Sequence, residues 1–158
     1  MADPLTPTRI LQLGLGYQGA KVLLSAVELG LFTELAKQPM DGEHLRTRLG
    51  LHPRSARDFF DTLVALGMLE RENSVYRNAP ETDQFLDRSK TSYIGGYFEM
   101  HNARMYPFWG SLTEGLRTQK TSFTQEVSTD PALNHVEREQ PVYLSNIRPT
   151  HRPKGGGV

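Results

Sequence analysis

The most informative stretch of the sequence spans residues 41–77 and reads DGEHLRTRLGLHPRSARDFFDTLVALGMLERENSVYR. Its first part predicts a short helix over residues 42–48. Asp41 is a suitable N-cap for that helix because a short side-chain oxygen can accept hydrogen bonds from the first free backbone N–H groups. Gly50 is well placed to end the helix, since glycine adopts the left-handed conformation that a helix terminus needs.

A second helix is predicted to begin at Pro53 and to run to Leu66. Proline is favoured at the first position of a helix, where its missing N–H has no intrahelical partner. The apolar residues of this segment recur at helical spacing and define one side of the helix. They are Ala56, Phe59, Phe60, Leu63 and Leu66. Gly67 is expected to end the helix.

Two short extended runs follow, residues 68–72 and 75–77, on either side of the polar pair Asn73 and Ser74. This pattern predicts a small β-hairpin. A helix, a tight glycine turn, a second helix and a hairpin in this order are typical of a winged helix-turn-helix unit. The predicted fold is therefore mainly α, with a winged helix-turn-helix-like domain, a small β-hairpin wing and a long C-terminal helix.

Upstream, residues 8–35 carry apolar side chains at three- and four-residue intervals, which indicates helix. Gly14, Gly16 and Gly19 weaken the middle of this pattern. We therefore expect one helix to about residue 15 and a second over residues 19–29. Gly30 is placed to cap the second helix, and a short helical turn is expected over residues 32–36.

Downstream, a short helix is predicted over residues 81–87 and a longer one over residues 93–117, which Pro107 must kink or interrupt. Beyond it the chain is polar and proline-punctuated. The predicted organisation is a winged-helix-like domain over residues 1–118 and an irregular, poorly ordered tail over residues 119–158.

Composition narrows the classes of function. Lys plus Arg and Asp plus Glu number 18 each, which argues against a dedicated nucleic-acid binder, and no cysteine is present. No secretory signal and no apolar run of the ~20 residues that span a bilayer is found. The expectation is a cytoplasmic protein that binds neither nucleic acid nor a membrane.

The segment GLGYQG, residues 14–19, matches the glycine fingerprint of dinucleotide-binding proteins. That mechanism needs a buried strand before the glycines and an acidic residue about twenty positions later at the end of a second strand. Asp41 has the spacing, but no second strand precedes it. The match is interpreted as coincidental, with the glycines allowing close helix packing or a break between helices.

No catalytic or metal-binding motif stands out. The histidines are not spaced to place two ligands on one helical face, and no nucleophile elbow or phosphate loop occurs. His44 and His52 are expected at helix ends on the surface, whereas His101 lies in an aromatic and methionine-rich helix. We therefore predict no catalytic residue, no metal and no cofactor in this chain.

Three stretches resemble the N-terminal dimerisation domain of the plant- and actinobacterial-type S-adenosylmethionine-dependent O-methyltransferases. The first is KVLLSAVELGLF at residues 21–32, and the second is residues 55–70, with LVALGML at 63–69. The third, residues 109–118, joins WGSL to GLRT and resembles the helix that leads into the catalytic domain. Together the resemblance covers residues 8–118.

The resemblance implies that the winged helix builds an interlocked homodimer and does not read DNA. It also implies that the long helix lines a small-molecule substrate pocket through Met100, Asn102, Met105 and Trp109. S-adenosylmethionine is the cofactor implied for the full-length family. The glycine-rich donor strand and the histidine base of the family do not follow residue 118. The expectation is thus a truncated chain, not catalytic alone, that pairs with a second copy or with a full-length relative.

The alternative reading is a winged-helix transcription regulator in which the helix over residues 53–66 enters the major groove. It requires Arg46, Arg48, Arg54 and Arg57 to converge on one surface. Acidic residues on the same helix and on the wing oppose it, since they repel phosphate. A nucleotide-binding fragment that uses residues 14–19 is the third reading.

Overall fold

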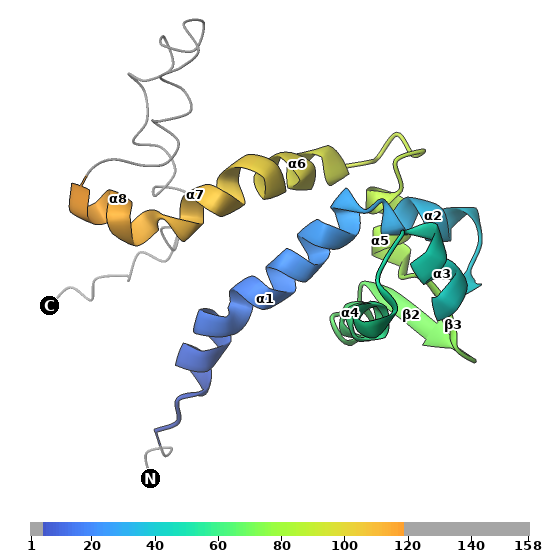
Figure 1. Cartoon of the computed structure of the whole chain (residues 1–158), viewed down its shortest axis with the longest axis horizontal. Coiled ribbons are helices and arrows are strands. Elements are labelled where there is room, and N and C mark those ends of the chain that lie inside the picture. The colour runs from blue at the N-terminus through green and yellow to red at the C-terminus, as the bar shows by residue number, and fades with distance from the viewer. Residues whose placement is uncertain (1–4, 119–158) are drawn as a thin grey trace, which may run out of the picture. The chain divides into compact units, whose positions relative to one another are not determined.

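The computed structural model describes residues 5–118 (Figure 1). The chain divides into two units, Met1–Pro107 and Phe108–Val158. The first unit is mainly helical and has one small antiparallel sheet, which confirms the predicted fold class. Among the described residues, no helix is both long and apolar enough to cross a membrane. The tail predicted over residues 119–158 lies outside the described residues.

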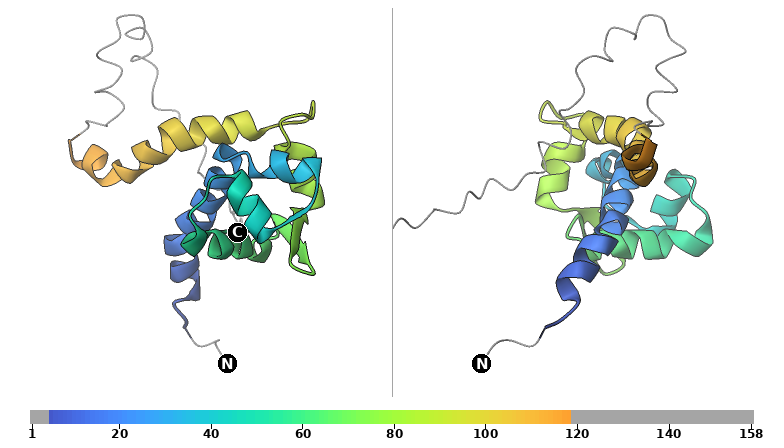
Figure 2. Two further views of the ribbon diagram at one scale, coloured as in Figure 1. Left: turned by 45° about the vertical axis from the view of Figure 1, so that its right-hand side comes forward. Right: turned by 90° about the vertical axis from the view of Figure 1, so that its left-hand side faces the viewer.

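The helices and strands follow one another in a simple order (Figures 1 and 2). The helices of the first unit are α1 Thr8–Glu28, α2 Leu31–Lys37, α3 Gly42–Arg48, α4 Pro53–Ala65, α5 Pro80–Leu86, α6 Gly95–Met100 and the π-helix η1 His101–Met105. Helix α7, Tyr106–Gly110, spans the unit boundary, and α8, Leu112–Thr118, belongs to the second unit. The strands are β1 Met40–Asp41, β2 Leu69–Glu72 and β3 Val75–Asn78.

The helix-turn-helix element forms as predicted. Oδ1 of Asp41 accepts hydrogen bonds from the backbone N–H groups of Glu43 and His44, both at 3.0 Å, and so caps α3. Gly50 and Gly67 follow α3 and α4 with φ angles of 65° and 73°, the left-handed conformation that ends a helix. Local chemistry alone therefore sets the ends of both helices.

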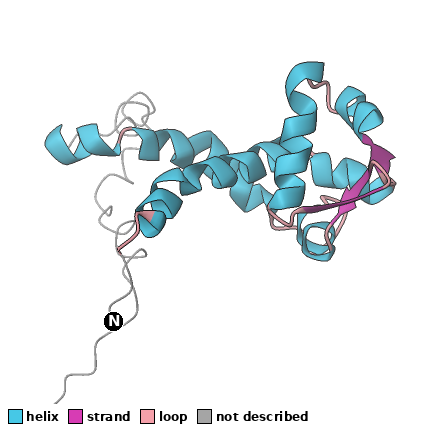
Figure 3. Cartoon of the chain, turned by 90° about the horizontal axis from the view of Figure 1, so that it is seen from below, coloured by secondary structure: helices cyan, strands magenta, loops and turns pink. Residues whose placement is uncertain are grey.

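The predicted hairpin is also present, and it carries a third strand that the pattern did not predict. Asn73 and Ser74 both have positive φ, 49° and 68°, as the tight turn of a two-residue hairpin requires. Strand β3 pairs with β2 on one side and with β1 on the other, in the order β1-β3-β2 (magenta in Figure 3). Strand β1 has only two residues, too few to show an alternating pattern in the sequence, so it is recognised only by its pairing with β3.

The break predicted within the first helical region is wrong. Residues 8–28 form the single helix α1, and Gly14, Gly16 and Gly19 lie inside it. A glycine in a helix interior costs only about 1 kcal/mol relative to alanine, and it has no intrinsic need to leave the helical conformation. The cap is confirmed, because Gly30 has φ 69° and its N–H donates to the carbonyl of Val27.

The core lies between α2, α3, α4 and the sheet. Its most deeply buried side chains are Leu31, Phe32, Leu45, Phe60, Leu63 and Leu69. On α4, Ala56, Phe60 and Leu63 are buried as predicted and Phe59 is half-buried, but Leu66 is exposed. Leu66 lies just beyond α4, where the chain turns at Gly67, so its side chain projects past the core.

The long helix predicted over residues 93–117 begins at Gly95 and is not uniform. It passes from α6 into the π-helix η1, in which the N–H of Tyr106 donates to the carbonyl of His101, five residues back. Pro107 follows directly, and proline has no N–H to continue an α-helical ladder and clashes with the carbonyl four residues earlier. The wider π turn before Pro107 is thus where the predicted distortion occurs.

A hydrogen-bonded cluster ties α4 to the sheet, and it yields a testable prediction. The buried Tyr76 donates its hydroxyl to Oδ1 of Asp61 at 2.7 Å, and Arg71 pairs with the same oxygen at 2.6 Å. The Tyr76 hydrogen bond, followed by the Arg71 charge, lowers the pKa of Asp61. A carboxylate whose pKa is lowered by folding stabilises the protein above its unfolded pKa, and this contribution is lost as pH falls through the lowered value.

Tyr76→Phe is expected to lower the free energy of unfolding at neutral pH by about 1 kcal/mol, the net value of one hydrogen bond. It should also move the pKa of Asp61 upward toward its ordinary value, which a carboxyl NMR titration measures. Tyr97→Phe is the matched control, because the Tyr97 side chain is exposed. Equal effects of the two variants on stability would contradict the assigned bond.

Candidate dimerisation surface and pocket wall

The amino-terminal half of α1 exposes an apolar surface, here called the α1 surface. It consists of Ile10, Leu11, Leu13, Leu15 and Tyr17, each between 51% and 85% exposed. The start of the helix extends beyond α2–α5 (Figures 1 and 2). A helix with apolar residues on more than one side is normally buried, so this part of α1 lacks the cover that its composition calls for.

The α1 surface occupies two sides of the helix. At 3.6 residues per turn, Ile10, Leu13 and Tyr17 share one side, and Leu11 and Leu15 share another. Between them, Gly14 and Gly16 have open space where a Cβ would stand. The second side continues into the body of the unit, since the Cβ position of Gly19 lies 3.5 Å from a methyl group of Leu66. The exposed side chain of Leu66 therefore belongs to the same apolar region.

The glycine fingerprint at residues 14–19 lies wholly within α1. Within the described part of the chain no strand precedes it, and β1–β3 are antiparallel. A dinucleotide fold places these glycines between a parallel strand and a helix N-terminus. The structure thus agrees with the interpretation of the motif as coincidental.

The carboxyl-terminal half of α1 is joined to η1 by polar contacts. Nζ of Lys21 donates to Oδ1 of Asn102 at 2.5 Å, and Nδ2 of Asn102 donates to Oε2 of Glu28 at 2.5 Å. The Lys21 ammonium group also lies 5.1 Å from the centre of the Tyr106 ring, within the range of a cation–π interaction. Asn102 therefore links two α1 side chains to the π-helix.

A second cluster, centred on Arg88, holds the end of α1. The Arg88 guanidinium donates to the Val27 carbonyl at 3.2 Å and to Oε1 of Glu99 at 2.6 Å. The Tyr93 hydroxyl donates to the same carboxylate oxygen at 2.9 Å. The bond from Arg88, followed by that from Tyr93, lowers the pKa of Glu99. Sequence reasoning did not find this cluster, because its members share no motif or spacing.

The predicted pocket residues lie on the same helical run but in two units. In the first unit, Met100 is exposed, and Asn102 and Met105 are half-buried. The ring of His101 lies 4.2 Å from that of Tyr97, centre to centre, so His101 packs against an aromatic neighbour. Trp109 belongs to the second unit, where its ring lies 5.9 Å from that of Phe108. Their role in a substrate pocket stays a prediction.

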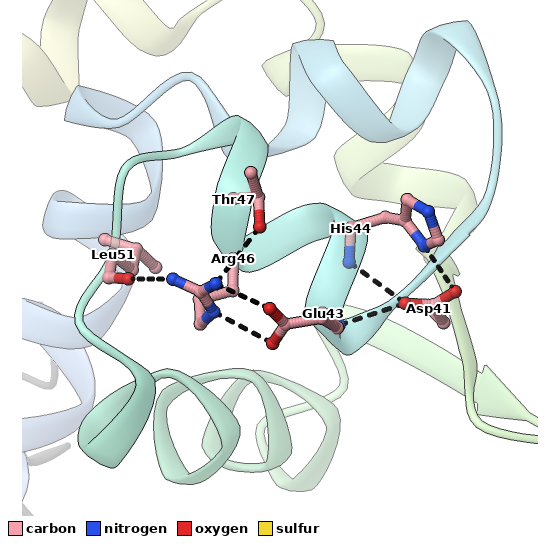
Figure 4. Close-up of polar contacts among 6 residues, drawn as sticks. All are labelled: Asp41, Glu43, His44, Arg46, Thr47 and Leu51. Carbon is pink, nitrogen blue, oxygen red and sulfur yellow. Dashed lines mark hydrogen bonds and ion pairs between the residues drawn. The ribbon is translucent and has the colours of Figure 1, made fainter.

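The arginines that DNA binding would need are largely engaged with acids. Arg46 forms a two-bond contact with Glu43, at 2.5 and 2.9 Å, and donates to the Leu51 carbonyl (Figure 4). Arg57 lies 3.6 Å from Asp61, and Arg48 lies 3.8 Å from Glu34. A phosphate contact would have to replace these partners. His44 and His52 are exposed at helix starts, as predicted.

Comparison with known proteins identifies the domain. Residues 11–88 match the family model of the O-methyltransferase dimerisation domain. The chain is 52% identical over 113 residues to the tetracenomycin polyketide synthesis 8-O-methyl transferase TcmO of Streptomyces glaucescens, covering 71% of this chain and 33% of that protein. It is 41% identical to the N,N-dimethyltransferase OxyT of Streptomyces rimosus, covering 72% of this chain and 34% of that protein.

A solved structure, PigF with SAH, agrees with a TM-score of 0.66 at 28% identity, covering 72% of this chain and 34% of that one. The chain thus spans about a third of the length of the relatives it matches. These relatives are named as methyltransferases and give no support to a DNA-binding regulator. Residues 11–88 of this chain are therefore an O-methyltransferase dimerisation domain.

Proposed function

We propose that this domain forms a homodimer by burying the α1 surface against a second copy of the chain. One observation supports the proposal most strongly: Ile10, Leu13 and Tyr17 face solvent on a helix whose other half is packed into the core. Burial of an exposed leucine or isoleucine side chain contributes about 1.5–3 kcal/mol. Several such side chains on each copy provide a favourable free energy for association.

We further propose that this domain is part of an enzyme that transfers a methyl group from S-adenosylmethionine to a small molecule. The names of the relatives support this reaction class, and one of them is solved with SAH. In the enzyme of which this domain would be a part, Met100, Asn102, Met105 and Trp109 would line the wall of the substrate pocket. Methionine and aromatic side chains suit such a wall because they offer an adaptable, largely apolar surface.

Sedimentation velocity of the complete chain over a range of micromolar concentrations tests the dimer. We expect a concentration-dependent shift from the mass of one chain, 17.8 kDa, toward twice that mass. Stable protein dimers usually bury about 1,600 Å² or more, which such an apolar helix can help to supply. A single species with the mass of one chain across the whole range would refute the homodimer.

A further inference from the structure

Asn102 occupies an unusual place between two charged side chains of α1. Lys21 and Glu28 are seven residues apart, close to two helical turns, so they lie on one side of α1. The Asn102 oxygen accepts from Lys21, and its nitrogen donates to Glu28, both at 2.5 Å. Each half of the amide thus has a partner of the appropriate charge. This set of three residues is called the α1–η1 clamp.

The segment that the clamp holds is a π-helix, which is a less stable arrangement than an α-helix. Such turns are rare and short, and they often occur at functional sites. Met105 ends η1 and Met100 immediately precedes it, so the clamp lies between two of the residues proposed to line the pocket. The clamp supplies this segment, just before Pro107, with hydrogen bonds to a second helix.

We propose that Asn102 is a positioning residue: through Lys21 and Glu28 it fixes η1 on α1, and thereby orients the methionines of the pocket wall. The proposal rests on the proposed function, in which this wall contacts a small molecule. It assigns Asn102 a role in addition to its place in the pocket wall. One oxygen lone pair and one N–H of this amide are hydrogen-bonded to charged groups of α1, and these two bonds set the orientation of the amide.

The test is backbone hydrogen exchange of residues 100–106, followed by mass spectrometry on the complete chain. Asn102→Ala removes both bonds and is expected to speed exchange in this segment about tenfold, as hydrogen bonds to charged groups are worth at least about 1.4 kcal/mol. Asn102→Asp is expected to have a similar effect, because it places a second carboxylate beside Glu28.

A double variant separates the clamp from a simple packing role. Asn102→Asp combined with Glu28→Gln reverses the direction of the second hydrogen bond: the new amide on α1 donates to the new carboxylate on η1. Lys21 still donates to an oxygen of residue 102, which is now a negatively charged carboxylate. Exchange in the double variant is therefore expected to return toward the wild-type rate, although neither residue is the original one.

Arg104→Ala is the matched control on the same π-helix, because within the described residues the Arg104 side chain is exposed and makes no hydrogen bond or ion pair. Wild-type exchange in Asn102→Ala, or no recovery in the double variant, would overturn the positioning role. Sedimentation of the same samples reports on the dimer separately. A wild-type chain that is a monomer would count against the proposed function. Unchanged exchange in Asn102→Ala would count only against the clamp.

Discussion

Leu13→Glu is expected to raise the dissociation constant of the proposed dimer at least about a hundredfold. The substitution removes about 1.5–3 kcal/mol of apolar burial per copy, and a twofold dimer contains the change twice. Each 1.4 kcal/mol corresponds to a factor of ten in the constant. Burial of the new carboxylate adds a further cost, because a charge without a partner is poorly solvated at an apolar interface.

The variant should leave the single chain intact. Leu13 is 85% exposed, and leucine and glutamate have similar helix propensities, so circular dichroism should match that of wild type. Thr91→Glu adds the same charge at an exposed position between α5 and α6 and serves as the control. Sedimentation equilibrium measures all three proteins. If Leu13→Glu and Thr91→Glu dissociate alike, the α1 surface is not the interface.

Phe60→Ala is expected to lower the free energy of unfolding by about 3–5 kcal/mol, through lost burial and the cavity that remains. Phe60 is 1% exposed, and its ring lies 5.4 Å from that of Tyr76 and 5.9 Å from that of Phe59. It therefore joins α4 to the sheet at the centre of the core. A stability of 5–15 kcal/mol is usual for a domain, so this loss is a large fraction of the total.

Chemical denaturation at one fixed protein concentration measures this effect, since association with a second chain would otherwise change the apparent stability. Phe85→Ala is the control, because it deletes the same ring at an exposed position of α5. We expect it to cost less than about 1 kcal/mol, as surface substitutions usually do. Similar losses at Phe60 and Phe85 would mean that the core is not centred on α4.

Much of the helix-turn-helix and hairpin could be predicted because their signals are local. The cap at Asp41, the proline at position 53 and the glycines at 30, 50 and 67 act within a few residues of themselves. Positive φ at Asn73 and Ser74 likewise follows from the turn chemistry of a two-residue hairpin. Backbone preferences and capping bonds need no distant partner, so the residues by themselves determined these boundaries.

Other features depend on contacts between segments far apart in the chain. The glycines of α1 were expected to break the helix, yet residues 8–28 remain one helix, which packs along its second half. Strand β1 exists because β3 pairs with it, and the π turn at residues 101–105 was visible only as an expected distortion near Pro107. Propensity describes single residues, whereas these outcomes depend on pairing and packing.

In the candidate site, too, some features follow from the sequence and others from the tertiary structure. The amino acids alone determined the family, the apolar character of α1 and the aromatic and methionine-rich stretch around residue 100. Only the folded chain decided that Ile10 and Leu13 lie uncovered while Val27 is buried, and that Asn102 bonds to Lys21 and Glu28. The physical reason is that hydrophobicity and hydrogen-bonding capacity belong to a residue, whereas exposure and partners arise from segments that meet in three dimensions.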